Sequence, residues 1–380
     1  MIHKNKCCGC TACIHACPVK CIEMKEDKEG FLYPTVDNEK CINCHKCERV
    51  CPVENLRNGN TETKTFVGYS KKEEIRKVSS SGGIFSLVSE WILSQNGVVF
   101  GASFDENFEV YHVAAETEEE LSKLRGSKYV QSRLGDVYPL VKQYLENNRK
   151  VLFTGTACQI AGLKNYLKKD YENLYTVDVL CHGVPSSKIW RTYLEDKREQ
   201  YNSPIKKIEF RNKEKGWVNY SVNIEFADNR RYCAKFSEDK YIQMFLGNID
   251  LRPSCHYCRF KDFPRISDMT IGDSWGITSY MPDMFDDKGT SDIFVNSQKG
   301  RQMLDEVSES LVLRDADFEK VLSMTYDIRK AALKHPNRKK FFEGVEKGED
   351  INTLHGYLKK SIVQKASSFI RRTFARLRAL

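Results

Sequence analysis

The sequence predicts a protein of mixed α+β and α/β class, in which a small cysteine-rich module precedes a larger domain. Ten of the fifteen cysteines lie between residues 7 and 51. A strand–helix–strand pattern follows much later, over residues 151–180, and is typical of parallel sheets. The chain has 380 residues, of which 41% are hydrophobic. This is enough for two or three domains with a substantial core.

The cysteine-rich segment contains one spacing twice. Each copy reads C-x2-C-x2-C-x3-C and is followed by proline, Pro18 in the first copy and Pro52 in the second. In such a pair, three thiolates of each loop bind one [4Fe–4S] cluster and the fourth binds the other cluster. The spacing predicts a bacterial-type two-cluster ferredoxin domain over residues 1–56, with strands near 21–24 and 31–34. Cluster one is assigned to Cys7, Cys10, Cys13 and Cys51, and cluster two to Cys41, Cys44, Cys47 and Cys17.

Zinc is the alternative for this segment, because C-x2-C pairs also occur in zinc sites. Two complete copies with proline at the matching place favour iron–sulfur clusters. Cys8 and Cys21 fall outside the spacing, and we interpret them as spare thiols near the clusters. Cys233 lies in a strand-like alternation and is predicted to belong to the core.

The elements of the larger domain are predicted in order. Residues 57–65 are polar and predict a linker, and the domain itself extends over 66–345. After the small residues of 79–83, apolar side chains at helical spacing predict a helix that ends at Gly97. Residues 98–101 and 110–113 predict paired strands. Residues 151–154, 158–168 and 175–180 then predict the parallel strand–helix–strand unit.

Four later cysteines predict a third cluster site. Cys158 begins the predicted helix and Cys181 follows the next strand, so parallel pairing places both at the sheet edge where α/β proteins bind ligands. The helix N-terminus favours the thiolate form of Cys158. Cys255 and Cys258 form a C-x2-C loop that completes the four. Two core cysteines and a separate zinc loop would give the same pattern.

The net charge of +8 is concentrated at the end of the chain, because residues 357–380 hold seven Lys or Arg and no acid. The nearly neutral remainder argues against nucleic-acid binding. Residues 346–380 are predicted to be a basic amphipathic tail that binds a membrane surface, the protein's own body or an acidic partner. The sequence has no run of eighteen apolar residues and no secretory signal. We therefore expect a cytoplasmic protein, peripheral at the inner face of the membrane if the tail binds there.

Several segments in order resemble the β-subunit family of coenzyme F420 hydrogenases and dehydrogenases, over roughly residues 1–300. The resemblance implies FAD beside one [4Fe–4S] cluster held by the four later cysteines. It also implies hydride exchange between the flavin and a substrate, coenzyme F420 being one option. The matching segments are residues 79–83, 125–132 (RGSKYVQS), 153–159 (FTGTACQ), 181–186 (CHGVPS), the Cys255 and Cys258 loop, and 271–276 (IGDSWG).

Candidate flavin ligands follow from this resemblance. Residues 79–83 would cradle phosphate at a helix start, and residues 154–156 are predicted to form a tight turn that the ring approaches closely. His182 is assigned a structural role, with substrate protonation as the alternative. Asp273 and Trp275 are predicted to lie in a strand-to-turn segment near the Cys255 and Cys258 loop, with a core position as the alternative for Trp275. No catalytic residue is assigned. The flavin candidates are Ser79, Ser80, Ser81, Gly82, Gly83, Arg125, Ser127, Lys128, Tyr129, Thr154, Gly155 and Thr156.

These features together predict an iron–sulfur flavoprotein oxidoreductase. A flavin accepts two electrons together and releases them singly, which suits a junction between a hydride carrier and clusters. The predicted partners are a ferredoxin, a hydrogenase or dehydrogenase subunit, or a small redox substrate. The alternative is a non-catalytic electron-transfer subunit of a larger complex. A redox-sensing module is the third interpretation, and the lack of a DNA-binding motif disfavours it.

Overall fold

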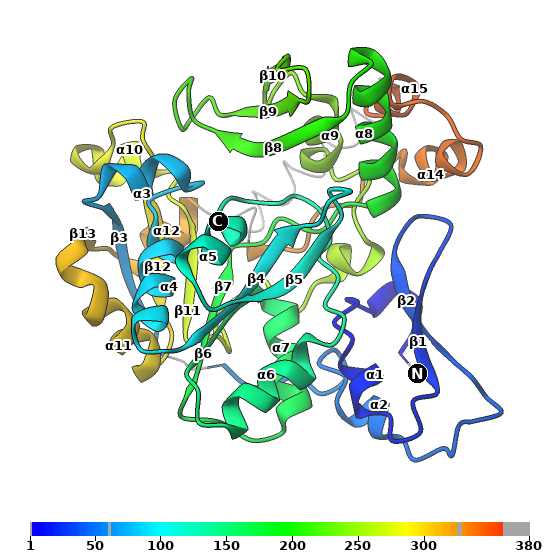
Figure 1. The fold of residues 1–380 in the computed structure, drawn as a ribbon, viewed down its shortest axis with the longest axis horizontal. Coiled ribbons are helices and arrows are strands. Elements are labelled where there is room, and N and C mark those ends of the chain that lie inside the picture. Colours follow the sequence, from blue (N-terminus) through cyan, green and yellow to red (C-terminus); the bar gives the residue numbers. More distant parts are fainter. Residues whose placement is uncertain (1, 60–61, 325–328, 360–380) are drawn as a thin grey trace, which may run out of the picture.

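The computed structural model describes residues 2–59, 62–324 and 329–359. In this part of the chain, the strands form sheets of two, three and eight strands. The eight-stranded sheet lies in the middle of the main domain with helices on both faces. The two smaller sheets lie at its periphery (Figure 1). No helix within the described residues is both long enough and apolar enough to cross a membrane.

The N-terminal module is built around a two-stranded antiparallel sheet, as predicted. β1 (Ile22–Glu26) pairs with β2 (Leu32–Val36). Each cysteine repeat carries a short helix, α1 (Ala12–Ala16) or α2 (Lys46–Arg49), and the turn η1 (Lys4–Lys6) precedes the first. Thr11 and His45 occupy equivalent positions of the two repeats, and both have left-handed backbone φ, 62° and 55°. The repeated spacing therefore produces a repeated backbone turn.

The large sheet has the order β13-β3-β12-β11-β7-β6-β4-β5. Its middle strands β11, β7, β6 and β4 are parallel, and antiparallel strands extend it on both sides. β3 begins at Lys64, inside the predicted linker. The bounds are β3 (Lys64–Ser70), β4 (Val98–Phe104), β5 (Val110–Ala115), β6 (Val151–Thr156), β7 (Leu174–Val179), β11 (Met269–Asp273), β12 (Ser291–Val295) and β13 (Leu311–Asp315).

Alternating side chains of β6 hold helices on the two faces of this sheet. Leu152 packs with residues of α4 (Ile84–Ser94) and α11 (Gln298–Val307). Val151 and Phe153 point to the other face, where α6 (Val137–Glu146) and α7 (Ala157–Leu167) cover them. The predicted helix after residues 79–83, the paired strands β4 and β5, and the parallel unit β6–α7–β7 are confirmed.

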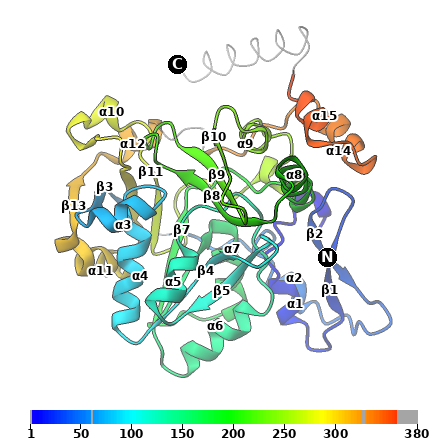
Figure 2. The ribbon, with the colours of Figure 1, turned by 45° about the horizontal axis from the view of Figure 1, so that its top comes forward.

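A third layer covers one end of the sheet (Figure 2). It consists of β8 (Ile205–Asn212), β9 (Ser221–Phe226) and β10 (Arg231–Lys235) with helices α8 (Ser187–Tyr201), α9 (Lys240–Leu246), α14 (Arg338–Glu346) and α15 (Ile351–Gly356). Its core includes Phe31 of the N-terminal module and Ile351 of α15. Thus α15, within the range assigned to the tail, packs on the body. Residues 360–380, which carry most of the predicted amphipathic pattern, lie outside the described part of the chain.

The prediction that Cys233 belongs to the core is wrong. It does lie in a strand, β10, but that strand is at the edge of the three-stranded sheet and all its residues are at least partly exposed. The remaining elements are α3 (Glu73–Val78), α5 (Glu118–Leu124), η2 (Pro253–Tyr257), α10 (Ile277–Tyr280), η3 (Pro282–Met284), η4 (Ser308–Ser310) and α12 (Phe318–Met324).

One buried carboxylate should make the stability of the fold depend on pH. Asp250 is fully buried, and neither of its carboxylate oxygens has a hydrogen-bond partner among the described residues. Burial raises the pKa of Asp250 to about 7, whereas an unfolded chain has about 3.9. The folded protein therefore holds a proton that the unfolded chain releases, so stability falls as pH rises from about 4 through about 7.

Asp250→Asn removes this titration. We expect the variant to have a higher free energy of unfolding than wild type at about pH 8, and a shallower decline between about pH 5 and 8. Urea unfolding at several pH values measures both effects. Asp136→Asn is the control, because its side chain is 97% exposed. Equal pH slopes for wild type and Asp250→Asn would contradict the prediction.

Candidate cofactor cavity and cluster sites

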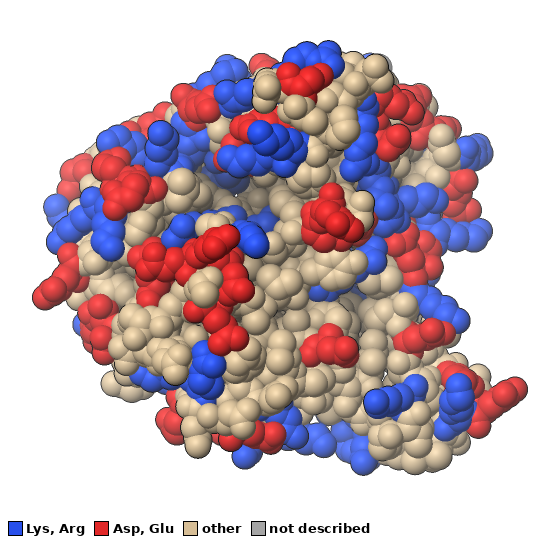
Figure 3. Space-filling model, in the orientation of Figure 1, with Lys and Arg blue, Asp and Glu red and all other residues tan. Residues whose placement is uncertain are grey.

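A cavity of about 590 Å³ lies at the carboxyl ends of the parallel strands. Residues 154–156 of β6, Val179 of β7 and residues 271–273 of β11 line it. α/β proteins bind ligands at this edge, where loops leave the strands. The surface is hollowed between the β8–β10 layer and helices α3–α5, and Lys and Arg side chains lie beside the hollow (Figure 3).

This cavity collects the residues that the sequence singled out. Every predicted flavin candidate except Gly82 lines it, although these residues come from three separate segments of the chain. His182, Asp273 and Trp275 line it too. So do the four later cysteines, Cys158, Cys181, Cys255 and Cys258.

The 79–83 segment is a turn that leads directly into α4. Gly83 is the N-cap residue with φ of 92°, a left-handed conformation that favours glycine. The Ser80 hydroxyl accepts the Ser127 backbone N–H at 2.8 Å, and the Ser81 hydroxyl donates to a carbonyl before β12 at 2.8 Å. The first backbone N–H groups of α4 have no acceptor within the helix, because no helical residues precede them. The serine side chains therefore fix this turn, and the free N–H groups at the start of α4 lie at the cavity wall.

The two cations of the 125–129 segment are both held by protein groups. Arg125 donates to the Glu90 carboxylate at 2.9 Å. The Lys128 ammonium donates to three carbonyl oxygens of residues 124–126 at 3.0–3.3 Å, and burial lowers its pKa to about 7. The Tyr129 ring stacks on Phe245 with centroids 5.0 Å apart. The segment thus forms a preorganised wall with fixed side chains.

The prediction of a tight turn at residues 154–156 is wrong. These residues are the last three of β6, and Gly155 pairs with Asp178 while Thr156 pairs with Val179 in the parallel ladder. Thr156 is also the N-cap of α7, so the strand passes into the helix without an intervening loop. Glycine at 155 nevertheless allows the Gln159 side chain to lie close to the backbone, because a Cβ on residue 155 would be 2.8 Å from the Gln159 side-chain oxygen.

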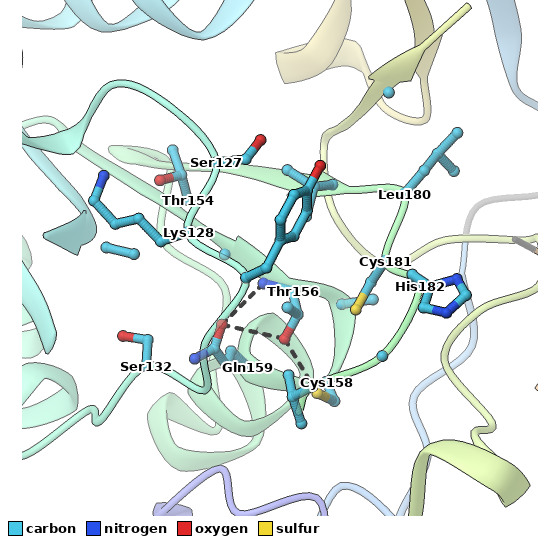
Figure 4. A pocket seen from close by; sticks show the side chains of 18 of the residues that line it. Ser127, Lys128, Ser132, Thr154, Thr156, Cys158, Gln159, Leu180, Cys181 and His182 are labelled. Carbon is cyan, nitrogen blue, oxygen red and sulfur yellow. Dashed lines mark hydrogen bonds between the residues drawn. The ribbon is translucent and has the colours of Figure 1, made fainter. Parts of the chain in front are cut away.

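The third cysteine set comes together in space from three elements. Cys158 lies in the first turn of α7, Cys181 follows β7, and Cys255 and Cys258 lie in or beside η2. The electrostatic effects of Cys158, Cys181 and Cys258 all reach Cys255. In Figure 4 the Cys181 side chain points toward Cys158, whereas His182 points to the opposite side of the chain. The four thiols therefore line one cavity.

The prediction that the helix N-terminus favours the thiolate form of Cys158 is wrong, because other groups outweigh that effect. A hydrogen bond with the Cys8 thiol, followed by burial, raises the pKa of Cys158 well above its ordinary value. Burial also raises the pKa of Cys181 to about 12. Thiols in such surroundings ionise when a metal supplies the compensating charge.

Arg211 and Lys261 line the cavity and were missed in the sequence. Arg211 of β8 makes a two-point ion pair with Asp273, at 2.7 and 3.0 Å. Trp275, 40% exposed, stacks on the buried Trp217 with centroids 4.7 Å apart. Lys261 donates to the His182 carbonyl at 2.7 Å. Arg211 precedes Asp273 by 62 residues, and no local pattern indicates that they meet.

The ferredoxin cysteines form two neighbouring groups. Cys7, Cys10, Cys13 and Cys51, assigned to cluster one, line a single small cavity together with Cys47. In the other group, the Cys21 sulfur lies 3.4 Å from that of Cys17, and Cys41 is near enough to raise the pKa of Cys21. Cys21 is therefore next to two of the predicted ligands of cluster two.

Comparisons with known proteins identify both parts of the chain. The family model described as coenzyme F420 hydrogenase/dehydrogenase, beta subunit N-term, matches residues 65–138. The companion model, for the C terminus of the same beta subunit, matches residues 148–320. A 4Fe-4S dicluster domain matches residues 6–55. No curated protein matches the sequence.

Among solved structures, this chain is similar to a chain of the F420-reducing [NiFe] hydrogenase complex from Methanosarcina barkeri, solved as a xenon derivative. It is 20% identical, with a TM-score of 0.49, and the match covers 75% of this chain and 92% of that chain. A likeness at this level carries no functional argument.

The dicluster domain and the α/β main domain define the class as an iron–sulfur electron-transfer protein. The chain belongs to the coenzyme F420 hydrogenase/dehydrogenase beta subunit family, whose two models together match most of it. The resemblance seen in the sequence and the ferredoxin-type domain are thereby confirmed.

Proposed function

We propose that this chain is an iron–sulfur flavoprotein oxidoreductase with three [4Fe–4S] clusters and FAD. It would pass electrons between an external redox partner and a flavin that reduces or oxidises an organic carrier such as coenzyme F420. The observation that carries the proposal is that one cavity contains both the four later cysteines and the flavin candidates. A cluster and a flavin bound there would be neighbours.

The thiols of the third set suit a cluster better than a single ion. Among the residues with defined positions, no group of three or more Cys, His, Asp or Glu side chains is placed to bind one metal ion. A [4Fe–4S] cluster has one thiolate on each iron, so its ligands stand further apart than those of zinc. Burial raises the pKa of Cys258, and the nearby cations Lys261 and Arg265 oppose this shift. Cys158, Cys181, Cys255 and Cys258 would hold the cluster.

The charge of the cavity wall suits a dinucleotide. Eight Lys or Arg residues line the cavity against two acids, Glu54 and Asp273. The start of α4 presents backbone amides there, and helix N-termini bind phosphate. FAD, when bound, supplies both two-electron and one-electron chemistry. The side chains of residues 125–129 would orient the FAD. Arg125 and Lys128 are already fixed in place, by the Glu90 carboxylate and by backbone carbonyls respectively.

The second candidate function is a non-catalytic electron-transfer subunit of a larger complex. The two-cluster module at the edge of the molecule favours it, because such a module relays single electrons without a substrate (Figure 1). The Cys41–Cys47 loop of this module is accessible, with Ile42 60% exposed. A redox partner protein is part of both proposals. Membrane contact through residues 357–380 stays a prediction.

Anaerobic purification of the full chain tests the proposal. We expect about twelve irons and sulfides per chain, four per cluster, with bound FAD. Titration of the flavin absorbance with NADH, NADPH, reduced ferredoxin and reduced F420 would then identify the donor. About eight irons without flavin would contradict the proposal. Bound flavin that no small carrier reduces or reoxidises would favour the subunit function.

A further inference from the structure

The ferredoxin module packs against a face of α7 made of small residues. Cys158 lies at the start of the helix, and Ala161 and Gly162 follow three and four positions later, on the same face. A Cβ on Gly162 would lie 2.7 Å from the Tyr138 hydroxyl of α6, 2.8 Å from the Cβ of Cys10 and 3.0 Å from the Cys10 sulfur. Any larger side chain at 162 must therefore displace α7, the Tyr138 side chain or a predicted ligand of cluster one.

Cys8 fills the space between the two cysteine sets. Its thiol is close enough to the thiols of Cys10 and Cys158 for both to affect its ionisation. It packs in one apolar cluster with Cys51, Cys158 and Cys258. Cys8 also lines both the cluster-one cavity and the large cavity. It therefore lies between ligands predicted for two different clusters.

A buried guanidinium supports the same contact. Arg252 is fully buried and donates to the Cys7 carbonyl at 2.8 Å and to the Leu32 carbonyl at 2.9 Å, both in the module. It also donates to Gln131 of the main domain at 3.0 Å. The module is thus held at the cavity wall by a residue that lines the cavity.

Of the four cysteines assigned to cluster two, only Cys47 lines the small cavity beside the cluster-one site. Cys17, Cys41 and Cys44 line neither cavity. Their loop carries exposed residues, Ile42 among them. The two ferredoxin sites therefore differ, with one next to the flavin-domain cysteines and the other next to solvent.

We propose that Cys8 and the Cys158–Gly162 face of α7 are positioning residues that hold the cluster-one site against the third cluster site. Electrons would then enter or leave the main domain through the cluster-one site, and an outside partner would exchange them at the cluster-two site. The exchange is a single-electron transfer, in which one site is oxidised as its neighbour is reduced and no bond forms or breaks. The inference rests on the proposed function, because it requires a third cluster.

Gly162→Ala tests the inference without altering a ligand, and Gly356→Ala is the control because a Cβ there meets nothing within 4 Å. We expect Gly162→Ala to retain all its iron. The EPR spectrum of the dithionite-reduced protein should show weaker spin–spin interaction between clusters, and flavin reduction through the ferredoxin module should slow severalfold. Gly356→Ala should match wild type in both.

Cys8→Ala is the second variant, in case Gly162→Ala loses iron, and Cys233→Ala is its thiol control. Cys8→Ala should give the same two changes by removing the bridging thiol. If a variant that keeps its iron shows the wild-type EPR interaction and reduction rate, the inference is overturned. If wild type itself contains only about eight irons, the proposed function fails instead, so the two failures are distinguishable.

Discussion

Replacing Cys255 with alanine is expected to lower the iron content from about twelve to about eight per chain, because one cluster loses a ligand. Flavin reduction by electrons from the ferredoxin module should fall to the background level. Burial raises the pKa of Cys255, and the other three thiols of its set are close enough to raise it further. Iron and sulfide analysis, with single-turnover flavin reduction, measures the two effects.

Cys233→Ala is the matched control for this change. Cys233 lies in β10, partly exposed, and lines neither cavity. The Cys233→Ala variant should retain the iron and flavin content of wild type. If Cys255→Ala also kept about twelve irons, the assignment of Cys255 to the third cluster would be wrong.

Arg252→Met is expected to lower the free energy of unfolding of the full chain by about 3 kcal/mol or more. A charged donor that satisfies buried acceptors contributes about 1.5–3 kcal/mol per hydrogen bond, and the acceptors left without it lose their partner. Arg252 makes three such bonds, at 2.8, 3.0 and 2.9 Å, to Cys7, Gln131 and Leu32. Chemical denaturation measures the difference.

Arg230→Met serves as the control for Arg252→Met. Its guanidinium is 54% exposed and pairs with a surface carboxylate of Asp228. Solvent-exposed pairs of this kind contribute little to stability, so the unfolding curve should stay near that of wild type. Indistinguishable curves for the Arg252 and Arg230 variants would show that Arg252 does not hold the module.

Much of the fold was predictable because its signals are local. The repeat of cysteines with proline predicts the dicluster module, and the dicluster domain is found at residues 6–55. The strand–helix–strand pattern over residues 151–180 predicts β6 and β7, with α7 between them. The error at residues 154–156 arises because glycine and threonine are common in turns, while here their pairing with β7 continues the strand.

The candidate site was predictable only in part. The segments around Ser79, Arg125 and Cys158 were identified one by one, and their meeting in one cavity depends on the order of the parallel strands. Arg211 and Arg252 carry no local signal. Their partners lie 62 and 245 residues away along the chain.

The ferredoxin module shows the same division most clearly. The sequence alone determined that this protein has two sets of cysteines with cluster spacing, because ligands of one loop lie within a few residues of one another. Only the tertiary structure decided which set faces the main domain. Cys8, interpreted from the spacing as a spare thiol, lines both the cluster-one cavity and the large cavity. Gly162 on α7 has no side chain and lets Cys10 approach the helix. Such an approach depends on how two separately folded surfaces pack, and that packing is not encoded in any short segment.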